Sequence, residues 1–180
     1  MSDSSECITF DCFTKEQMKE INGKIKENIF QEEQEGYGAP DTTKIGKFFN
    51  VPCLPLMELL HSWLYQCQQI NKEYFGYDVY WDFHLEGMNY NVYGIKGEYD
   101  WHVDSRWNTM PLDIKLTCML NLSEEPYEGG EFYTINSNEK HTFTSGMGLI
   151  INSLIAHKVA PVTKGERITL TYWGLGPSWR

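Results

Sequence analysis

The chain has 180 residues, of which 41% are hydrophobic, so it is long enough and apolar enough to bury a substantial core. Fifteen basic residues against 25 acidic residues give a formal net charge of −10, which disfavours proteins that wrap a nucleic-acid backbone. No stretch approaches the roughly 18 apolar residues of a transmembrane helix, so no membrane association is expected.

The cysteines argue against two further classes, disulfide scaffolds and cysteine-bound zinc proteins. Their number is odd and no pair has C-x-x-C spacing; they are Cys7, Cys12, Cys53, Cys67 and Cys118. The N-terminal "MSDSSECITF" has no basic region followed by an apolar run, so it does not resemble a secretion signal. Together these features predict a reducing, cytoplasmic setting.

The first part of the chain, about residues 14–73, reads as mainly helical. Thr14 followed by Gln17 has the form of a capping box and predicts a helix start. A stripe at helical spacing then follows, consisting of Met18, Ile21, Ile25 and Ile29. A second helix is predicted after Pro55, with a wide apolar stripe over 56–70. Both stripes are expected to pack in the core.

After Tyr74 the pattern changes to short runs typical of strands, about residues 74–176. Among them are "YDVYWDFHLE", "NYNVYG", "YDWHVD", "DIKLTCMLNLS", "GGEFYTI", "HTFTS", "GLIINSLIAHKV" and "RITLTYW", separated by turn residues. Many short strands without intervening helices predict a sandwich or barrel. We therefore expect one domain over 1–180, mainly β, with two N-terminal helices packed on an antiparallel double-sheet core.

A candidate metal site begins with "HVD". In a strand, residues two apart face the same side, so His102 and Asp104 point together. The third ligand is expected to be His157, at the end of the apolar run "GLIINSLIA", which predicts a central buried strand. Two histidines and one carboxylate on one face of a metal leave three positions open, an arrangement that suits non-haem Fe(II).

A basic residue follows the distal histidine. The turn "PVTKGE" is expected to send the chain back beside the strand of His157, and Arg167, Thr169 and Thr171 alternate to one face. A guanidinium buried in an apolar barrel must be paired, and a carboxylate can accept two parallel hydrogen bonds from it. The pattern indicates a dicarboxylate that binds the metal with one end and Arg167 with the other.

These residues, in this order, resemble the Fe(II)/2-oxoglutarate-dependent dioxygenases of the prolyl-4-hydroxylase-like branch. The run "YGIKGEYDWHVD" is similar to the strand that leads into the metal site of prolyl 4-hydroxylases, and "YEGGEF" to the family's Gly-Gly turn. The ending "HKVAPVTKGERITLTYWGLGP" is similar to phage-encoded and bacterial members. The resemblance covers roughly residues 85–176.

The resemblance implies a double-stranded β-helix, or jelly-roll, and a hydroxylase that uses Fe(II), 2-oxoglutarate and O₂. It implies that the iron is bound by His102, Asp104 and His157. It further implies 2-oxoglutarate contacts at Arg167, Thr169, Tyr93 and Asn121. Asn121 is a departure, because several prolyl hydroxylases have a tyrosine there. Related halogenases have a small residue in place of Asp104, so the aspartate favours hydroxylation.

The substrate is left open between alternatives. The stretch 105–114 predicts a loop over the site mouth, where Trp101, Arg106 and Trp107 either contact substrate or pack as a rim. The leading hypothesis is a peptidyl residue such as proline. The alternatives are a free amino acid or other small molecule, and a non-catalytic barrel that binds metal and 2-oxoglutarate. The sequence leaves the oligomeric state undetermined; if the chain is phage-encoded, it would act in a host cytoplasm.

Overall fold

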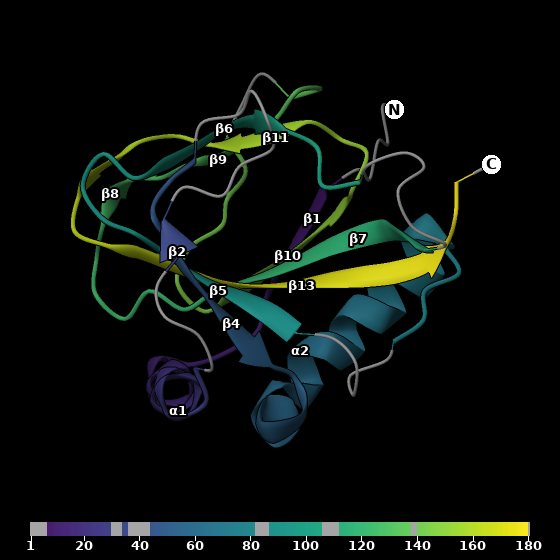
Figure 1. Ribbon diagram of the computed structural model, residues 1–180, viewed down its shortest axis with the longest axis horizontal. Helices are drawn as coiled ribbons and strands as arrows, with labels where there is room; N and C mark the ends of the chain where they lie inside the picture. The colour runs from purple at the N-terminus through teal and green to yellow at the C-terminus, as the bar shows by residue number, and fades with distance from the viewer. Residues whose placement is uncertain are drawn as a thin grey trace.

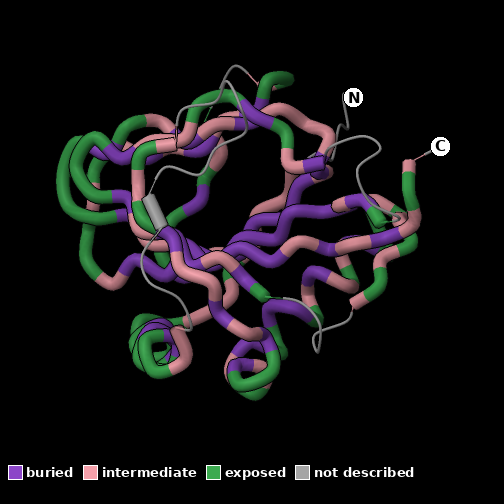
Figure 2. Tube along the Cα trace, viewed as in Figure 1, coloured by how far each residue is buried: buried purple, intermediate pink, exposed green. Residues whose placement is uncertain are grey.

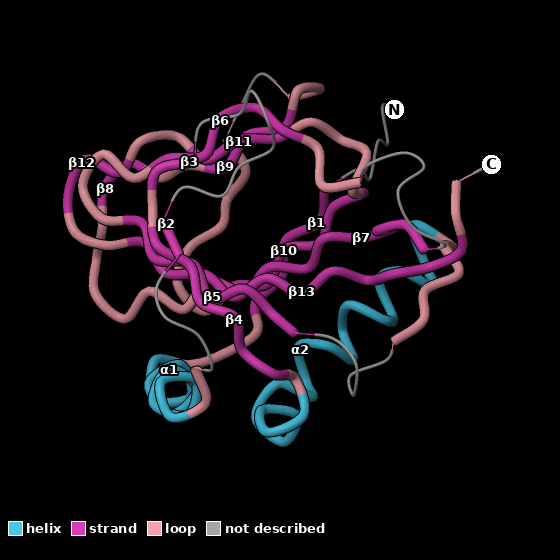
Figure 3. The backbone as a smooth tube through the Cα atoms, in the orientation of Figure 1, coloured by secondary structure: helices cyan, strands magenta, loops and turns pink. Residues whose placement is uncertain are grey.

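The fold is built from two facing antiparallel sheets with two helices outside one of them (Figures 1 and 3). The computed structural model describes residues 7–29, 34–35, 44–81, 87–105, 112–137 and 140–179. The mainly β class with N-terminal helices, predicted from the sequence, is confirmed. No helix in these ranges is long and apolar enough to cross a membrane.

The larger sheet has seven strands, all paired antiparallel. In spatial order they are β1 (Cys7–Asp11), β10 (Met147–Asn152), β7 (Leu112–Asn121), β13 (Arg167–Pro177), β5 (Gly87–Tyr93), β4 (Lys47–Pro52) and β2 (Gln34–Glu35). The smaller sheet has four strands, β3 (Lys44–Ile45), β6 (Glu98–His102), β11 (His157–Val159) and β9 (Phe132–Thr134). A separate pair joins β8 (Glu128–Gly129) and β12 (Val162–Lys164).

The helices cover the outer face of the larger sheet (Figure 1). Helix α1 (Lys15–Glu27) begins at the predicted capping box, in which the Thr14 and Gln17 side chains each accept from the other's backbone N–H. A short 3₁₀ turn, η1 (Leu54–Leu56), precedes α2 (Met57–Ile70), and the π-helical η2 (Asn71–Phe75) ends the helical part. Gly76 closes this segment in the left-handed region, with φ of 66°.

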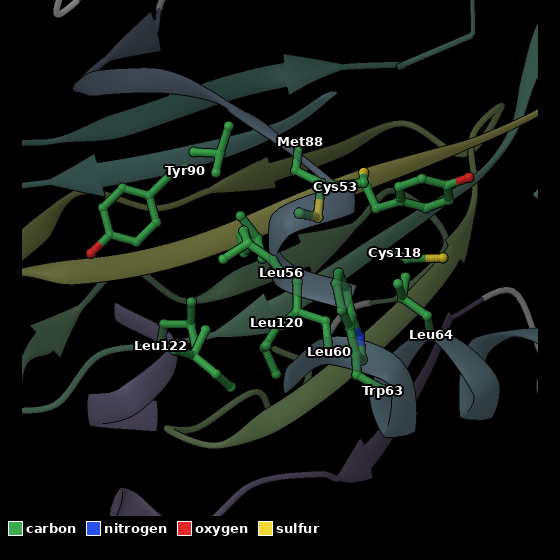
Figure 4. Packing of buried hydrophobic residues seen from close by; sticks show 14 of the residues in the cluster. Cys53, Leu56, Leu60, Trp63, Leu64, Met88, Tyr90, Cys118, Leu120 and Leu122 are labelled. Carbon is green, nitrogen blue, oxygen red and sulfur yellow. The ribbon is translucent and has the colours of Figure 1, made fainter. Parts of the chain in front are cut away.

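The main core lies between these helices and the larger sheet. Trp63, Leu60 and Leu64 of α2 pack toward Leu120 and Cys118 of β7 (Figure 4), and Figure 2 shows buried residues along the central strands of that sheet. A second, smaller apolar cluster fills part of the space near the smaller sheet; it consists of Met119, Phe132, Phe143, Leu149, Ile151 and Val159. The main core holds the larger sheet against the helices, and the smaller cluster limits the space that remains between the two sheets.

Several strand assignments from the sequence are wrong. β2, β3 and β4 lie in the part that was read as mainly helical, and β1 precedes it; all four lie at or next to a sheet edge. Residues 77–81 form no strand, and 82–86 lie outside the described residues. The run 141–145 forms only an isolated bridge between Phe132 and His141.

The chain around His157 also differs from the prediction. The run "GLIINSLIA" is not one strand: β10 ends at Asn152, whose side-chain oxygen accepts from the Leu154 N–H and closes a turn. The chain then crosses to the smaller sheet, where β11 begins at His157. The returning strand β13 pairs with β5 and β7, so Arg167 does not run beside His157 but belongs to the opposite sheet.

The packing of α2 gives a direct stability prediction. Trp63 is fully buried, whereas Tyr65 on the same helix is 53% exposed. Replacing Trp63 by alanine leaves a cavity and is expected to lower the free energy of unfolding by about 3–5 kcal/mol, measured by urea denaturation. Tyr65→Ala, the matched control, is expected to cost less than about 1 kcal/mol. Equal losses for the two variants would contradict this packing.

Candidate active site

Three side chains predicted as metal ligands meet inside the barrel. One ligand atom from each of His102, Asp104 and His157 lies within 4.8 Å of the other two. The His102 and His157 Nε2 atoms lie 3.7 and 3.6 Å from the two carboxylate oxygens of Asp104. Although 55 residues separate the histidines in the chain, they are direct cross-strand partners, because β6 and β11 pair with His102 opposite His157.

Each histidine is held so that its Nε2 atom faces the carboxylate. The His102 Nδ1 atom lies 2.7 Å from the Asp100 carbonyl oxygen, and the His157 Nδ1 atom lies 2.9 Å from that of Ile155. A carbonyl only accepts, so each Nδ1 carries a proton, and in the neutral ring Nε2 is the atom that offers a lone pair. Such a backbone anchor is the usual way in which a protein fixes the tautomer and orientation of a metal-binding imidazole.

The surroundings keep His102 neutral. Burial lowers the pKa of His102 to about 4, assisted by repulsion from His157 and opposed by attraction to Asp104. The Tyr99 ring stacks on the His102 ring with 3.5 Å between centroids, which excludes water from that face. An unprotonated imidazole is the form that binds a metal, so His102 is ready for ligation at neutral pH.

Asp104 is positioned by the neighbouring strand and turn. The Thr117 hydroxyl on β7 donates to the Asp104 Oδ2 atom over 2.5 Å. The backbone N–H groups of Asp104 and Ser105 both donate to the Ser153 carbonyl, 3.1 and 3.2 Å away. These contacts fix the carboxylate between the histidines, although Asp104 itself lies just beyond the end of β6.

Arg167 lies on the inner face of β13 and is 1% exposed. Its Nε and Nη2 atoms have no hydrogen-bond partner among the described residues, which is costly for a buried guanidinium. Its guanidinium carbon lies 5.5 and 5.7 Å from the ring centroids of Tyr93 and Phe143. The site therefore offers two adjacent buried donors to an acceptor such as a carboxylate.

The Gly-Gly turn makes room for this arginine. Gly130 has φ of 65°, and a Cβ there would lie 2.8 Å from the Arg167 Cδ. At Gly129, with φ of 77°, a Cβ would lie 2.3 Å from the Pro161 carbonyl oxygen. Both positions therefore favour glycine, for backbone conformation and for close packing.

The remaining predicted contacts divide into two groups. Thr169 and Tyr93 line the same cavity as Arg167 and the three ligand residues. Asn121, in contrast, uses its side chain within the protein: its Nδ2 donates to the Tyr127 hydroxyl and the Phe143 carbonyl, and its Oδ1 accepts from Ser123.

The predicted substrate residues are less well defined. Trp101 lies on the rim, 39% exposed, with the Lys158 ammonium 5.0 Å from its ring centroid. Arg106 and Trp107 lie outside the described residues.

Several lining residues were not identified from the sequence, among them Lys44, Asn91, Thr117 and Trp173. Thr117 and Trp173 could have been found by continuing the alternation of their strands, since Thr117 shares a face with Asn121 and Trp173 with Arg167. Lys44 carried no such signal, because β3 has only two residues.

Cavity size alone does not identify this site. The space between the ligand residues and Arg167 has a volume of about 40 Å³, whereas a cavity of about 650 Å³ lies between residues 124–132 and 140–145. The larger cavity contains no cluster of metal-ligating atoms among the described residues, so the chemistry is assigned to the smaller one. Neutral imidazole, carboxylate and a buried unpaired guanidinium fit a divalent iron and a dicarboxylate.

Comparison with known proteins agrees with this geometry. Residues 88–174 match the family described as the 2OG-Fe(II) oxygenase superfamily. A PKHD-type hydroxylase of Xylella fastidiosa (strain 9a5c) is 33% identical over 97 residues, which cover 47% of this chain and 42% of that protein. The matched region therefore spans less than half of that relative.

Two solved structures share the fold. The viral collagen prolyl hydroxylase of Paramecium Bursaria Chlorella virus-1, in complex with 2OG, aligns with a TM-score of 0.72 and 15% identity over 97% of this chain and 98% of the other. A Pseudomonas putida prolyl-4-hydroxylase aligns with a TM-score of 0.70 and 14% identity over 95% and 92%. Fe(II) and 2-oxoglutarate are the metal and co-substrate that the family and the triad imply. Over residues 88–174 the chain is thus similar to the 2OG-Fe(II) oxygenase superfamily.

Proposed function

We propose that this protein is an Fe(II)- and 2-oxoglutarate-dependent hydroxylase that acts on a peptidyl residue such as proline. The observation that carries the proposal is that a candidate metal site and a buried guanidinium face each other across one cavity. His102, Asp104 and His157 gather on one side, and Arg167, buried and with unpaired donors, lies on the other. This arrangement supports a ligand that bridges a metal and a guanidinium.

The roles of the residues follow from their chemistry. His102, Asp104 and His157 would hold Fe(II), and Arg167 with Thr169 would hold the far carboxylate of 2-oxoglutarate. When bound, iron and 2-oxoglutarate together activate O₂ for C–H hydroxylation, with succinate and CO₂ as products. The protein holds the two histidines in one tautomer, fixes the carboxylate through Thr117, and excludes water with the Tyr99 ring and the second apolar cluster.

The peptidyl substrate is supported by the proteins of similar fold, which include prolyl hydroxylases. A second candidate is a free amino acid or another small molecule. The small volume of the described cavity favours it, because about 40 Å³ accommodates little more than one water molecule. Side chains must therefore move for either substrate, and a small one demands less movement.

Removing a ligand residue tests the metal assignment. His102→Ala is expected to abolish succinate formation with Fe(II), 2-oxoglutarate and O₂, and to weaken Mn(II) binding by at least about 100-fold in calorimetry. His61→Ala, on the exposed side of α2, serves as the matched control and is expected to change neither. Turnover or Mn(II) affinity unaffected by His102→Ala would overturn the proposal.

Removing the guanidinium tests the co-substrate assignment separately. Arg167→Met is expected to weaken 2-oxoglutarate binding to the Mn(II)-loaded protein by roughly 10- to 100-fold, because two charge-assisted hydrogen bonds are lost. Mn(II) affinity should stay within about twofold, since Arg167 is not in the ligand cluster. Lys164→Met, an exposed lysine paired with Glu128, provides the control. Unchanged 2-oxoglutarate affinity in Arg167→Met would contradict this role.

A further inference from the structure

Lys44 is a third charged side chain in the cavity, beside Asp104 and Arg167, and it has no role in the proposed chemistry. Lys44 lies on β3, opposite Tyr99 of β6, and its side chain reaches into the space between the two sheets. Its ammonium nitrogen lies 4.7 Å from the centroid of the Phe48 ring and 5.0 Å from that of Tyr99. Within the described part of the chain, no carboxylate forms an ion pair with it.

A lysine in this position is costly without a counter-charge. Burial lowers the pKa of Lys44 to about 8, and attraction to Asp104 only partly offsets this effect. Contacts with two rings contribute a modest cation–π stabilisation, which an exposed lysine could make equally well. Charged side chains that are withdrawn from water are normally paired, so an anionic partner is expected to arrive with a ligand.

The hydrogen bonds around Lys44 have a fixed direction. The ammonium can only donate, and it donates to the Asn91 Oδ1 atom over 3.0 Å. The Asn91 Nδ2 atom donates to the Asn89 carbonyl over 3.1 Å and to the Thr171 hydroxyl oxygen over 3.2 Å, so both of its hydrogens are used. Because that oxygen accepts, its hydrogen is left to donate elsewhere. The side-chain oxygens of Asn91 and Thr171 both accept within this set of residues. The donors that are left belong to Lys44 and Thr171, which line the cavity.

Further donors lie along the same wall. The ammonium of Lys44 has N–H groups beyond the one that Asn91 takes. The Trp173 Nε1 atom is buried and has no partner among the described residues. Trp173 follows Thr171 on the inner face of β13 and is paired in register with Thr117, which holds Asp104. The wall formed by Lys44, Asn91, Thr171 and Trp173, here called the donor wall, therefore suits an acceptor-rich, negatively charged group.

Both carboxylates of 2-oxoglutarate are already assigned under the proposed function. One lies at the metal and the other at Arg167, on the inner face of β13 six residues before Trp173, or roughly 20 Å along an extended strand. The cavity charges lead to the same conclusion. Two cationic side chains, one carboxylate, a divalent iron and a dianionic co-substrate leave one positive charge, which one further carboxylate would neutralise.

We infer that the donor wall binds a carboxylate of the primary substrate and so orients that substrate beside the metal. This inference rests on the proposed function and narrows its substrate class. The carboxylate belongs either to a free amino acid or to a peptide, through an acidic side chain or a C-terminus. Lys44 is thus a specificity-determining residue, and Asn91 and Thr171 position its ammonium.

The test uses the full chain loaded with Mn(II) and 2-oxoglutarate without oxygen, and measures binding by calorimetry. The probes are matched pairs: the free L-amino acids against their carboxamides, and Ala-Pro-Gly and C-terminally amidated Ala-Pro-Glu, each against C-terminally amidated Ala-Pro-Gly. At least one carboxylate probe should bind about tenfold or more tightly than its uncharged counterpart. The pair that shows this preference identifies the source of the carboxylate.

Three variants distinguish the contribution of the Lys44 charge from the effect of losing any surface lysine. Lys44→Met keeps most of the apolar stem and should remove the preference, whereas Lys44→Arg should keep it. Lys47→Met, an exposed lysine three residues along, should keep it as well. All variants are first compared with the parent by thermal unfolding, and Lys44→Gln replaces Lys44→Met if the latter is destabilised.

Three results would overturn the inference: no carboxylate preference in the parent protein, a preference that survives Lys44→Met or Lys44→Gln, or a loss of 2-oxoglutarate affinity in those variants. The last result would assign Lys44 to the co-substrate. Failure of the proposed function is seen separately, as a parent protein that binds neither Mn(II) nor 2-oxoglutarate before any probe is added.

Discussion

The site depends on a buried guanidinium that faces a carboxylate and two imidazoles across the interior of the barrel. Arg167 belongs to the larger sheet and the two histidines to the smaller one, so the spacing between the sheets sets the distance that a ligand must bridge. An unpaired buried arginine is destabilising, and natural structures retain such groups mainly where a ligand pairs them. The free-energy cost of burying these unpaired donors is offset by the apolar burial in the large core on the other face of the same sheet.

That core explains why the larger sheet can serve as a platform. Helices α1 and α2 bury the outer face of β7, β13 and β5, which leaves the inner face free to carry polar residues. A buried hydrogen-bonded link further ties α1 to the sheet: Asn22 donates to the Leu122 carbonyl and accepts from the Tyr90 hydroxyl. Stability and chemistry are thereby separated onto the two faces of one sheet.

The sequence predicted the chemistry better than the architecture around it. The pairing of His102 with Asp104 holds although Asp104 lies beyond the end of β6, because Thr117 and Ser153 fix its position. Period-two alternation placed Arg167, Thr169 and Thr171 on one inner face, because that pattern is local to a strand. It failed where the chain changes sheets. The apolar run before His157 gave no sign that β10 ends at Asn152, since the turn is held by hydrogen bonds of Asn152 and Ser153, partly to residues distant in the chain.

Other features could not be predicted because they are products of tertiary packing. Short strands such as β3 acquire their conformation by pairing with β6, so no pattern in the sequence identified Lys44 as a lining residue. The role of Asn121 illustrates the same limit. Alignment by position predicts a co-substrate contact there; it does not predict the hydrogen bonds of its amide to Tyr127 and Phe143, residues that only the fold brings near.

The central claim is that one ligand spans the triad and Arg167, and a crystal structure grown with Mn(II) and 2-oxoglutarate tests it most directly. The account predicts anomalous density for one metal bound by the His102 Nε2, an Asp104 oxygen and the His157 Nε2. It also predicts a dicarboxylate chelating that metal, with its far end paired to Arg167. A metal bound elsewhere, or a co-substrate whose far carboxylate does not reach Arg167, would contradict the account.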